Sequence, residues 1–415
     1  MVAIPNIQAI TELYAAGNSP YLCPQCRLLK GDDELIKYIY EKGTGGVNDV
    51  LLKRYAGGFD KAVTQVFGAG RQYPDLEREL RLNAGKFGTY KTYDLCRELE
   101  RAREAGLSLE EFKDFATGGI GLYNGYQRTE YNTLVSRSRT AKQWERFQDE
   151  KLHYPNIEWL RTASANPRAE HLAYIGLILP MDDPFWTNNQ PGNLYNCKCD
   201  WRSTDKAATK RPDTHYEPAA GLEGNPAETN ELVTERHPYF KRNGKAPRWV
   251  DDKAKLQCPD EVCFVEKTTP SGNKYLEHLL VSKAQEATDN RMFAALLVEN
   301  GHKDVKLLPK IKDTERSLRE RYFGKDYAAK HLTTSPDAWA DGALFEFKKS
   351  NIKQFTKRVG IAAGQSNIAF IRVTEPISDK VLKFKINKQW DMSDRKNLEK
   401  IIVYSNGELK TFTRK

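Results

Sequence analysis

The chain has 415 residues, of which 65 are basic and 56 acidic, giving a formal net charge of +9. This length allows two or three domains, each with its own core. The sequence lacks an apolar run of roughly 18 residues and a basic-apolar N-terminal signal, so we expect neither a membrane span nor a membrane partner. Seven cysteines, an odd number, predict free thiols in a reducing compartment.

Residues 30–165 are predicted to be mostly helical. The segment 95–103 has the character of a helix, and Ser108 followed by Glu111 is typical of a capping box at the start of the next one. Upstream of this region, Cys23 and Cys26 have the spacing of a zinc knuckle.

Several motifs follow in the middle of the chain. In order, they are Tyr126-Gln127-Arg128-Thr129-Glu130-Tyr131-Asn132, Glu170-His171, Pro180-Met181-Asp182-Asp183-Pro184-Phe185-Trp186, Asn193-Leu194-Tyr195-Asn196-Cys197-Lys198-Cys199, Gly224-Asn225-Pro226 and His237-Pro238-Tyr239-Phe240. Over about residues 30–245 they resemble the Mu F-type minor head proteins of tailed phages, although Lys198 stands where that family usually has arginine. The resemblance implies a protein of the phage head, near the portal, that takes part in head morphogenesis with portal and head proteins as partners.

His171, Cys197 and Cys199 supply an imidazole and two thiols that could bind Zn²⁺. However, Cys-x-Cys is not the common knuckle, and no second His or Cys pair follows at a familiar spacing. We therefore expect packed free thiols and a hydrogen-bonded His171, with zinc as the alternative for these residues and for Cys23 and Cys26.

The segment 204–255 is rich in Pro, Gly, Asn and charge and lacks sustained periodicity, which predicts an extended arm or linker. The chain is thus predicted to be a multidomain α+β protein. Its parts would be a mostly helical minor-head domain over residues 1–203, the linker over 204–255 and an α/β domain over 256–415.

Within this last domain, residues 286–298 have helical apolar spacing that ends at Asn300 and Gly301. Residues 304–309 and 367–373 are predicted strands, and residues 352–365 a predicted helix. The order is helix, strand, hairpin, helix and strand.

The hairpin is predicted from Asp341 and Gly342, a two-residue turn signal between two short strands. In this register Asp337 faces Glu346, and Lys348 lies on their side because side chains alternate along a strand. The other face carries core residues, namely Ala338, Ala340, Ala343, Phe345 and Phe347. Opposed carboxylates repel unless something lies between them, which predicts a divalent cation here. The alternative is an ordinary hairpin whose acids pair with lysines.

The Pro-Asp and Glu-x-Lys elements resemble the PD-(D/E)xK nuclease superfamily. Residues 275–415 further resemble the tRNase-type C-terminal domains of contact-dependent inhibition toxins, although the charged segment 312–330 is longer than usual. The resemblance implies phosphodiester hydrolysis with Mg²⁺ or Mn²⁺ held by Asp337, Glu346 and a third acid. Lys348 would orient the water or neutralise the transition state. The third acid would be Glu286, with Asp289 and Glu299 as substitutes.

Positive charge accumulates in the same region. Residues 251–415 carry 31 basic and 23 acidic residues, a surplus of eight. Lys349, Lys353 and Lys357 recur every four residues, so a helix there would present a basic stripe beside the hairpin. Together with Arg358 they are the predicted nucleic-acid-binding residues.

These observations leave three hypotheses. The first is a head protein fused to a metal-dependent nuclease toxin, carried in the virion and acting in the bacterial cytoplasm on tRNA or DNA, with a possible immunity protein as partner. The second is a purely structural head protein whose C-terminal domain binds nucleic acid without cleaving it. The third is a metal-independent RNase that remains active in EDTA and depends on His or Arg.

Overall fold

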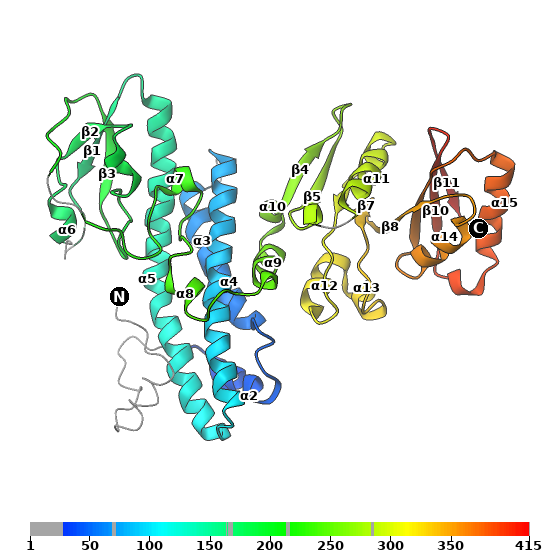
Figure 1. Cartoon of the computed structure of the whole chain (residues 1–415), viewed down its shortest axis with the longest axis horizontal. Helices are drawn as coiled ribbons and strands as arrows, with labels where there is room; N and C mark the ends of the chain where they lie inside the picture. The colour runs from blue at the N-terminus through cyan, green and yellow to red at the C-terminus, as the bar shows by residue number, and fades with distance from the viewer. Residues whose placement is uncertain are drawn as a thin grey trace. The chain divides into compact units, whose positions relative to one another are not determined.

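The computed structural model describes residues 28–68, 72–162, 164, 169–212, 216–283 and 286–414. The chain forms two compact units, Met1–Ala254 and Lys255–Lys415. The first is mostly helical and the second contains a mixed sheet, so the protein is a multidomain α+β protein (Figure 1). Within the described residues, no helix is both long and apolar enough to cross a membrane.

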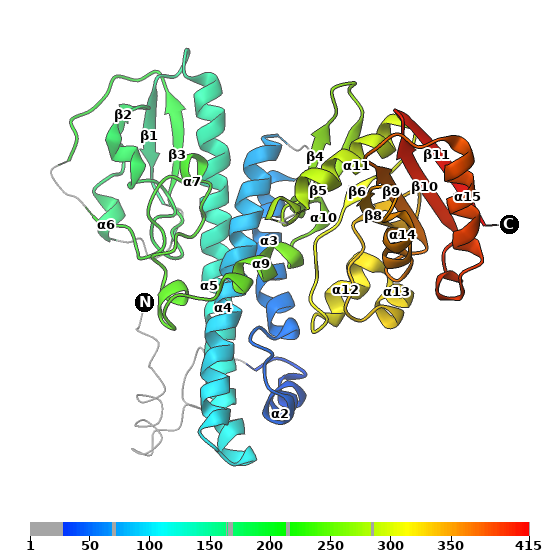
Figure 2. The same cartoon turned by 45° about the vertical axis from the view of Figure 1, so that its right-hand side comes forward.

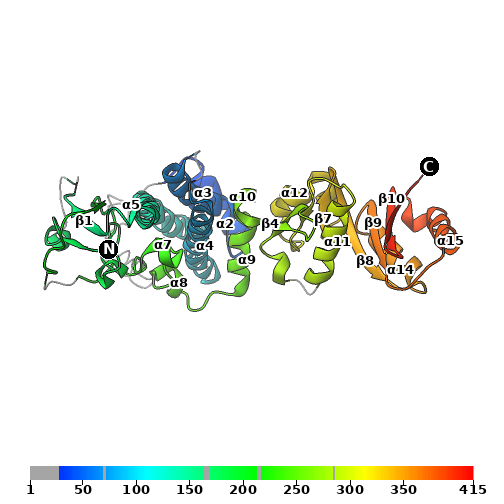
Figure 3. The same ribbon diagram turned by 90° about the horizontal axis from the view of Figure 1, so that it is seen from above.

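Three long helices form the body of the first unit. Figure 1 and, nearly end-on, Figure 3 show them side by side. The last of them begins at the predicted capping box, where the Glu111 backbone N–H donates to Ser108 Oγ (3.3 Å) and the Ser108 N–H donates to the Glu111 carboxylate (2.8 Å). A shorter helix packs against this one. The bounds are α2 (Asp32–Lys42), α3 (Asp49–Phe67), α4 (Pro74–Glu104) and α5 (Leu109–Glu150).

An ion pair is buried between α4 and α5. The ammonium of Lys91, which is fully buried, donates to the Glu130 carboxylate and to the Tyr123 backbone carbonyl (2.8 Å). Tyr239 donates its hydroxyl to the other oxygen of Glu130 at 2.7 Å. Glu130 and Tyr239 belong to two of the sequence motifs and are 109 residues apart. Their contact shows that these motifs meet in one core.

A three-stranded antiparallel sheet of order β2-β1-β3 lies beside the C-terminal part of α5 (Figure 1). Trp201 of β3 stacks on Trp144 of α5, with 5.7 Å between ring centroids. The elements of this region are β1 (Asn156–Leu160), α6 (Ala169–Leu172), β2 (Ile178–Pro180), η2 (Pro184–Thr187) and β3 (Asp200–Thr204).

The predicted arm or linker, residues 204–255, instead packs for much of its length onto the helices. Fully buried Arg137 of α5 donates to the backbone carbonyls of Leu222 (2.8 Å) and Gly224 (3.0 Å). Leu232 and Val233 join the helical core. The composition correctly indicated little regular structure, but it could not show that Arg137 and the apolar core hold this segment. Its helices are α7 (Pro226–Thr229), α8 (Pro238–Lys241) and α9 (Arg248–Gln257).

The second unit is built on an eight-stranded mixed sheet of order β11-β10-β9-β8-β7-β6-β5-β4 (Figure 2). Alternate residues of β9 face opposite sides, so that Phe370 packs with α11 while Ile371 packs with α14 and α15. The strands are β4 (Phe264–Thr268), β5 (Lys274–His278), β6 (Lys306–Leu307), β7 (Ala338–Ala340), β8 (Ala343–Ser350), β9 (Ile368–Val373), β10 (Lys400–Ser405) and β11 (Glu408–Thr413).

The helices of this unit follow the predicted order with shorter bounds in places. The predicted helix 286–298 and strand 367–373 are confirmed as α11 and β9, whereas the predicted strand 304–309 contracts to β6 and the predicted helix 352–365 contracts to α14. The helices are α10 (Asp260–Cys263), η3 (Val281–Lys283), α11 (Ala287–Glu299), α12 (Arg316–Phe323), α13 (Lys325–Lys330), α14 (Phe355–Ala363), α15 (Asp379–Trp390) and η4 (Ser393–Arg395).

Candidate functional site

The hairpin of β7 and β8 has the predicted register. Ala338 pairs with Phe345 and Ala340 with Ala343. The turn residues Asp341 and Gly342 have φ values of 50° and 77°, as a two-residue turn that follows the sheet twist requires. The predicted apolar face packs into the core under α11, where Phe347 stacks on Phe293. If the same register is continued by one residue pair, Asp337 lies opposite Glu346.

Asp337 is almost fully buried, and both of its carboxylate oxygens accept hydrogen bonds. Oδ1 accepts from Lys310 Nζ (2.8 Å) and Asn290 Nδ2 (3.2 Å), and Oδ2 accepts from the Phe347 backbone N–H (2.9 Å). Burial lowers the pKa of Lys310, and the nearby Asp337 carboxylate raises it. The net result is a pKa above the usual value for lysine. The Asp337 carboxylate is therefore hydrogen-bonded to a backbone amide and to an ammonium at the same time.

Glu346 is equally buried but has fewer hydrogen-bond partners. Its Oε1 accepts a hydrogen bond from Lys348 Nζ, whereas Oε2 has no hydrogen-bond partner. Burial and, after it, the Asp337 charge raise the pKa of Glu346 to about 8, although Lys348 and Lys310 pull it down. Lys348 thus bonds Glu346, and the Asp337 charge acts on the same carboxyl group, so the three residues lie near one another.

The raised pKa of Glu346 predicts a pH-dependent stability. The folded chain keeps this proton between about pH 4.5 and 8, so the stabilisation is complete below 4.5 and is lost as the pH rises through 8. In EDTA, we expect the second unit to lose on the order of a few kcal/mol between pH 6 and pH 9. Thermal unfolding of Glu346→Gln, whose amide does not titrate, should show a much smaller change. An equal change in both proteins would contradict the assignment.

A pocket of about 410 Å³ borders this group. Glu286, Asn290, Lys348, Lys349 and Arg358 are among its lining residues, while Asp337 and Glu346 are not. The bond partners Asn290 and Lys348 therefore separate the two buried carboxylates from the pocket. Among the described residues, Asp337, Glu346 and Glu286 do not bring their carboxylate oxygens within 4.8 Å of one another as a group.

The two substitutes for Glu286 differ in position. Asp289 also lines the pocket and lies 3.8 Å from the ammonium of Lys349. Glu299, at the other end of α11, accepts hydrogen bonds from Thr269, Ser271 and Asn273. Because a 13-residue helix is about 20 Å long, Glu299 is the wrong candidate for the third acid.

The basic residues beside the hairpin do not form the predicted helical stripe. Lys349 lies in β8 and Lys353 precedes α14, so that helix carries Lys357 and Arg358 but not the other two. The spacing of four was wrong as a helix signal because the chain leaves the strand and turns between these residues. Lys349, Lys353 and Lys357 are nevertheless exposed.

Two residues of this group did not emerge from the sequence. Lys310 lies just after β6, and Asn290 lies on the buried face of α11. The signal available for Asn290 was a polar residue at an apolar position of the helical pattern. Lys310 directly follows the Leu308-Pro309 pair that ends the predicted strand.

In the first unit, His171 Nδ1 lies 3.4 Å from both Cys197 Sγ and Cys199 Sγ. Cys197 and Cys199 form no disulfide within the described residues, and His171 is hydrogen-bonded. The three side chains also form a group of possible metal ligands whose atoms lie within 4.8 Å of one another. Cys23 and Cys26 lie outside the described residues.

The first unit is also where the chain is similar to a known family. The model of the family described as Phage Mu protein F like protein matches residues 58–202. Neither the curated proteins nor the solved structures contain a match to the chain. The matched span runs from α3 to β3 and includes His171, Cys197 and Cys199, whereas residues 255–415 lie beyond it. Residues 58–202, which form most of the long helices and the small sheet of the first unit, are therefore similar in sequence to this family.

Proposed function

We propose that this protein is a phage minor head protein that carries a metal-dependent nuclease in residues 255–415. The Mu F-like match supports the head part. The single observation that carries the nuclease part is the grouping of Asp337, Glu346 and Lys348 beside a pocket lined by basic residues. Metal-dependent phosphodiester hydrolysis can use such a combination of carboxylates, an ammonium and phosphate-binding cations.

The donor set fits a hard divalent cation. Glu346 Oε2 is buried and lacks a partner, and the repulsion between Glu346 and Asp337 is the kind of charge conflict that a cation relieves. Asp337 and Glu346 would hold Mg²⁺ or Mn²⁺, with Glu286 as the third acid at the pocket wall. The ion, when bound, supplies an acidified water and stabilisation of charge on the phosphate.

The remaining roles belong to side chains of the chain itself. Lys348 reaches both Glu346 and the pocket, so its ammonium would neutralise charge near the scissile phosphate. Lys349 and Arg358 line the same pocket and would bind neighbouring phosphates. Lys310 would move away from Asp337 when the ion enters.

In the virion, the first unit would contact portal and head proteins, and the second would reach its nucleic acid in the bacterial cytoplasm. Its substrate would be tRNA or DNA, and a toxic nuclease would need an immunity protein wherever its own host is exposed. This function is tested by incubating the full chain with tRNA and, separately, with DNA, in the presence of Mg²⁺, Mn²⁺ or EDTA, and measuring cleavage. Activity retained in EDTA would instead support the metal-independent RNase.

One observation favours the second candidate, a structural head protein that binds nucleic acid without cutting it. Each buried carboxylate already has a lysine partner, Lys310 for Asp337 and Lys348 for Glu346. Such a balanced network can exist for structural reasons alone. No cleavage under any condition, combined with salt-sensitive binding, would select this candidate.

Both candidates predict that the pocket cations bind phosphate. Each phosphate contact adds about 0.9 to the slope of log affinity against log salt for duplex DNA. Replacing Lys349 and Arg358 together by glutamine should lower that slope by about 2. The matched control replaces Lys267 and Lys274, exposed on the β4–β5 edge hairpin, and should leave the slope unchanged. Fluorescence anisotropy with labelled DNA measures both, and equal slopes would contradict the assignment.

A further inference from the structure

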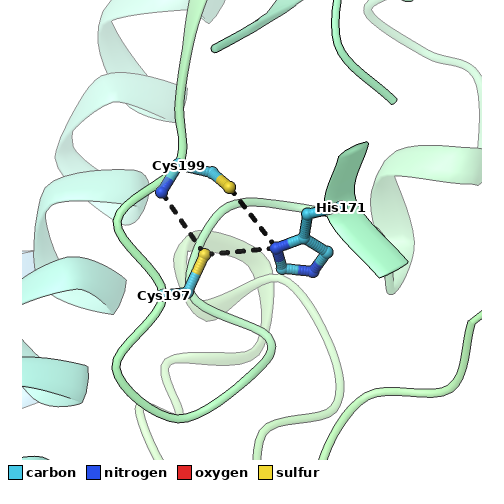
Figure 4. Close-up of side chains that lie close together, drawn as sticks. All are labelled: His171, Cys197 and Cys199. Atoms are coloured by element: carbon cyan, nitrogen blue, oxygen red, sulfur yellow. Dashed lines mark hydrogen bonds between the residues drawn. The ribbon is translucent and has the colours of Figure 1, made fainter. Parts of the chain in front are cut away.

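Three ligand atoms, one nitrogen and two sulfurs, converge in the first unit, which does not carry the proposed nuclease. Figure 4 shows the His171 ring turned toward the sulfur atoms of Cys197 and Cys199. His171 comes from α6, while the two cysteines come from the segment that leads into β3. His171 and Cys197 are buried, and Cys199 is partly exposed. The fold therefore joins segments more than 25 residues apart at this point.

The hydrogen bonds of His171 fix which nitrogen faces the sulfurs. Its Nε2 lies 2.9 Å from Asn193 Oδ1, and Asn193 Nδ2 donates to the Asn188 backbone carbonyl at 2.8 Å. Because the amide nitrogen of Asn193 is committed to Asn188, its oxygen must accept from His171, and Nε2 carries the proton. In the neutral ring, the lone pair of Nδ1 is then directed at both sulfurs, as metal-binding histidines require.

The spacing of the three atoms matches a tetrahedral zinc ion. Zn–S and Zn–N bonds of about 2.3 Å and about 2.0 Å at tetrahedral angles place sulfur and nitrogen about 3.5 Å apart. Both observed Nδ1–Sγ distances are 3.4 Å. The Cys199 backbone N–H also donates to Cys197 Sγ (3.5 Å), a contact that stabilises negative charge on that sulfur. Thiols that merely pack against apolar neighbours need none of these arrangements.

We propose that His171 Nδ1, Cys197 Sγ and Cys199 Sγ bind one Zn²⁺. Two sulfurs and one imidazole form a soft donor set that selects zinc over Mg²⁺ or Ca²⁺. The three residues also line a pocket of about 460 Å³ with Arg128 and Lys198. The fourth ligand is a water or a small anion that enters from this pocket. The ion cross-links α6 to the start of β3.

From sequence, free thiols are expected here, because Cys-x-Cys lacks a second paired group at a familiar spacing. In the structure, His171 is the third ligand beside the two cysteines, and its hydrogen bond to Asn193 orients the ring. The proposal concerns the first unit and does not depend on the nuclease.

Metal content of the full chain tests the proposal. The protein is purified without a histidine tag, and every variant carries Cys23→Ser and Cys26→Ser so that this pair cannot contribute metal. After zinc is supplied and excess removed, mass spectrometry of the metal should find about one zinc per chain. Adding Cys197→Ser and Cys199→Ser should lower the content at least tenfold. The control Cys96→Ala removes another buried free thiol and should retain the zinc.

Two further variants separate ligand loss from unfolding. Cys199→His replaces one thiolate with another metal ligand, so its Co²⁺ form should keep one metal with about half of the thiolate-to-cobalt absorption. Asn193→Leu should weaken zinc affinity about 10–100-fold by freeing the His171 ring. A chain that binds no zinc, a Co²⁺ form without thiolate absorption, or equal zinc loss in Cys96→Ala would overturn the proposal.

Discussion

The full chain with Glu346 replaced by glutamine is expected to lose Mg²⁺-dependent cleavage by at least about a hundredfold, as is typical when one group that stabilises transition-state charge is removed. Glutamine keeps the size of the side chain and one oxygen that can accept from Lys348, but it cannot become an anion. Because Glu346 is almost fully buried, a neutral amide also avoids the cost of burying a charge. The variant should therefore fold normally but lose cleavage.

A matched control is available on the same sheet. Glu277 of β5 is also buried and bonds to a cation, Arg291, but it does not line the pocket. Glu277→Gln should retain cleavage, measured in single-turnover assays on tRNA and on plasmid DNA. Comparable loss in both variants would mean that cleavage responds to damage anywhere in the sheet, and the assignment of Glu346 would be wrong.

Lys310 distinguishes a metal site from a structural ion-pair network. If Asp337 holds a cation, Lys310→Met should strengthen Mn²⁺ binding, because the ammonium that competes for Asp337 Oδ1 is gone. If the group is structural, the same change should leave an unpaired buried aspartate and destabilise the unit in the presence or absence of metal. Titration calorimetry with Mn²⁺ and thermal unfolding read these two outcomes separately.

The second large effect concerns the core of the first unit. Glu130→Ala is expected to destabilise this unit by about 3–5 kcal/mol, because it leaves the buried ammonium of Lys91 without a counter-charge. Tyr239 would lose its acceptor at the same time. Burial lowers the pKa of Lys91, and Glu130 counteracts that effect, so the loss should be smaller at alkaline pH, where the isolated lysine can give up its proton.

Urea denaturation followed by tryptophan fluorescence measures this effect, because five of the seven tryptophans lie before residue 255. The double change Lys91→Met with Glu130→Gln removes both charges and keeps an acceptor for Tyr239. It should recover most of the lost stability. If the double variant is as unstable as Glu130→Ala, packing and not charge explains the loss.

The feature that was predicted correctly depends on residues close together in the sequence. The features that were missed depend on residues or boundaries that local patterns do not show. The hairpin was predictable residue by residue because its turn, its register and its two faces depend on neighbours within about ten positions. The prediction of a basic helical stripe was wrong because periodicity cannot show where β8 ends and α14 begins. The prediction of a linker was wrong because composition cannot show that Arg137 binds the carbonyls of a segment about 85 residues away.

The sequence by itself determined the multidomain α+β character, the helical nature of the first part, and the hairpin next to Asp337, Glu346 and Lys348. Only the tertiary structure placed Lys310 and Asn290 on Asp337, and His171 on the two cysteines. The physical reason is that strand alternation and turn geometry are local properties of the backbone. The charge balance and ligand set of a site depend on which distant segments pack against it.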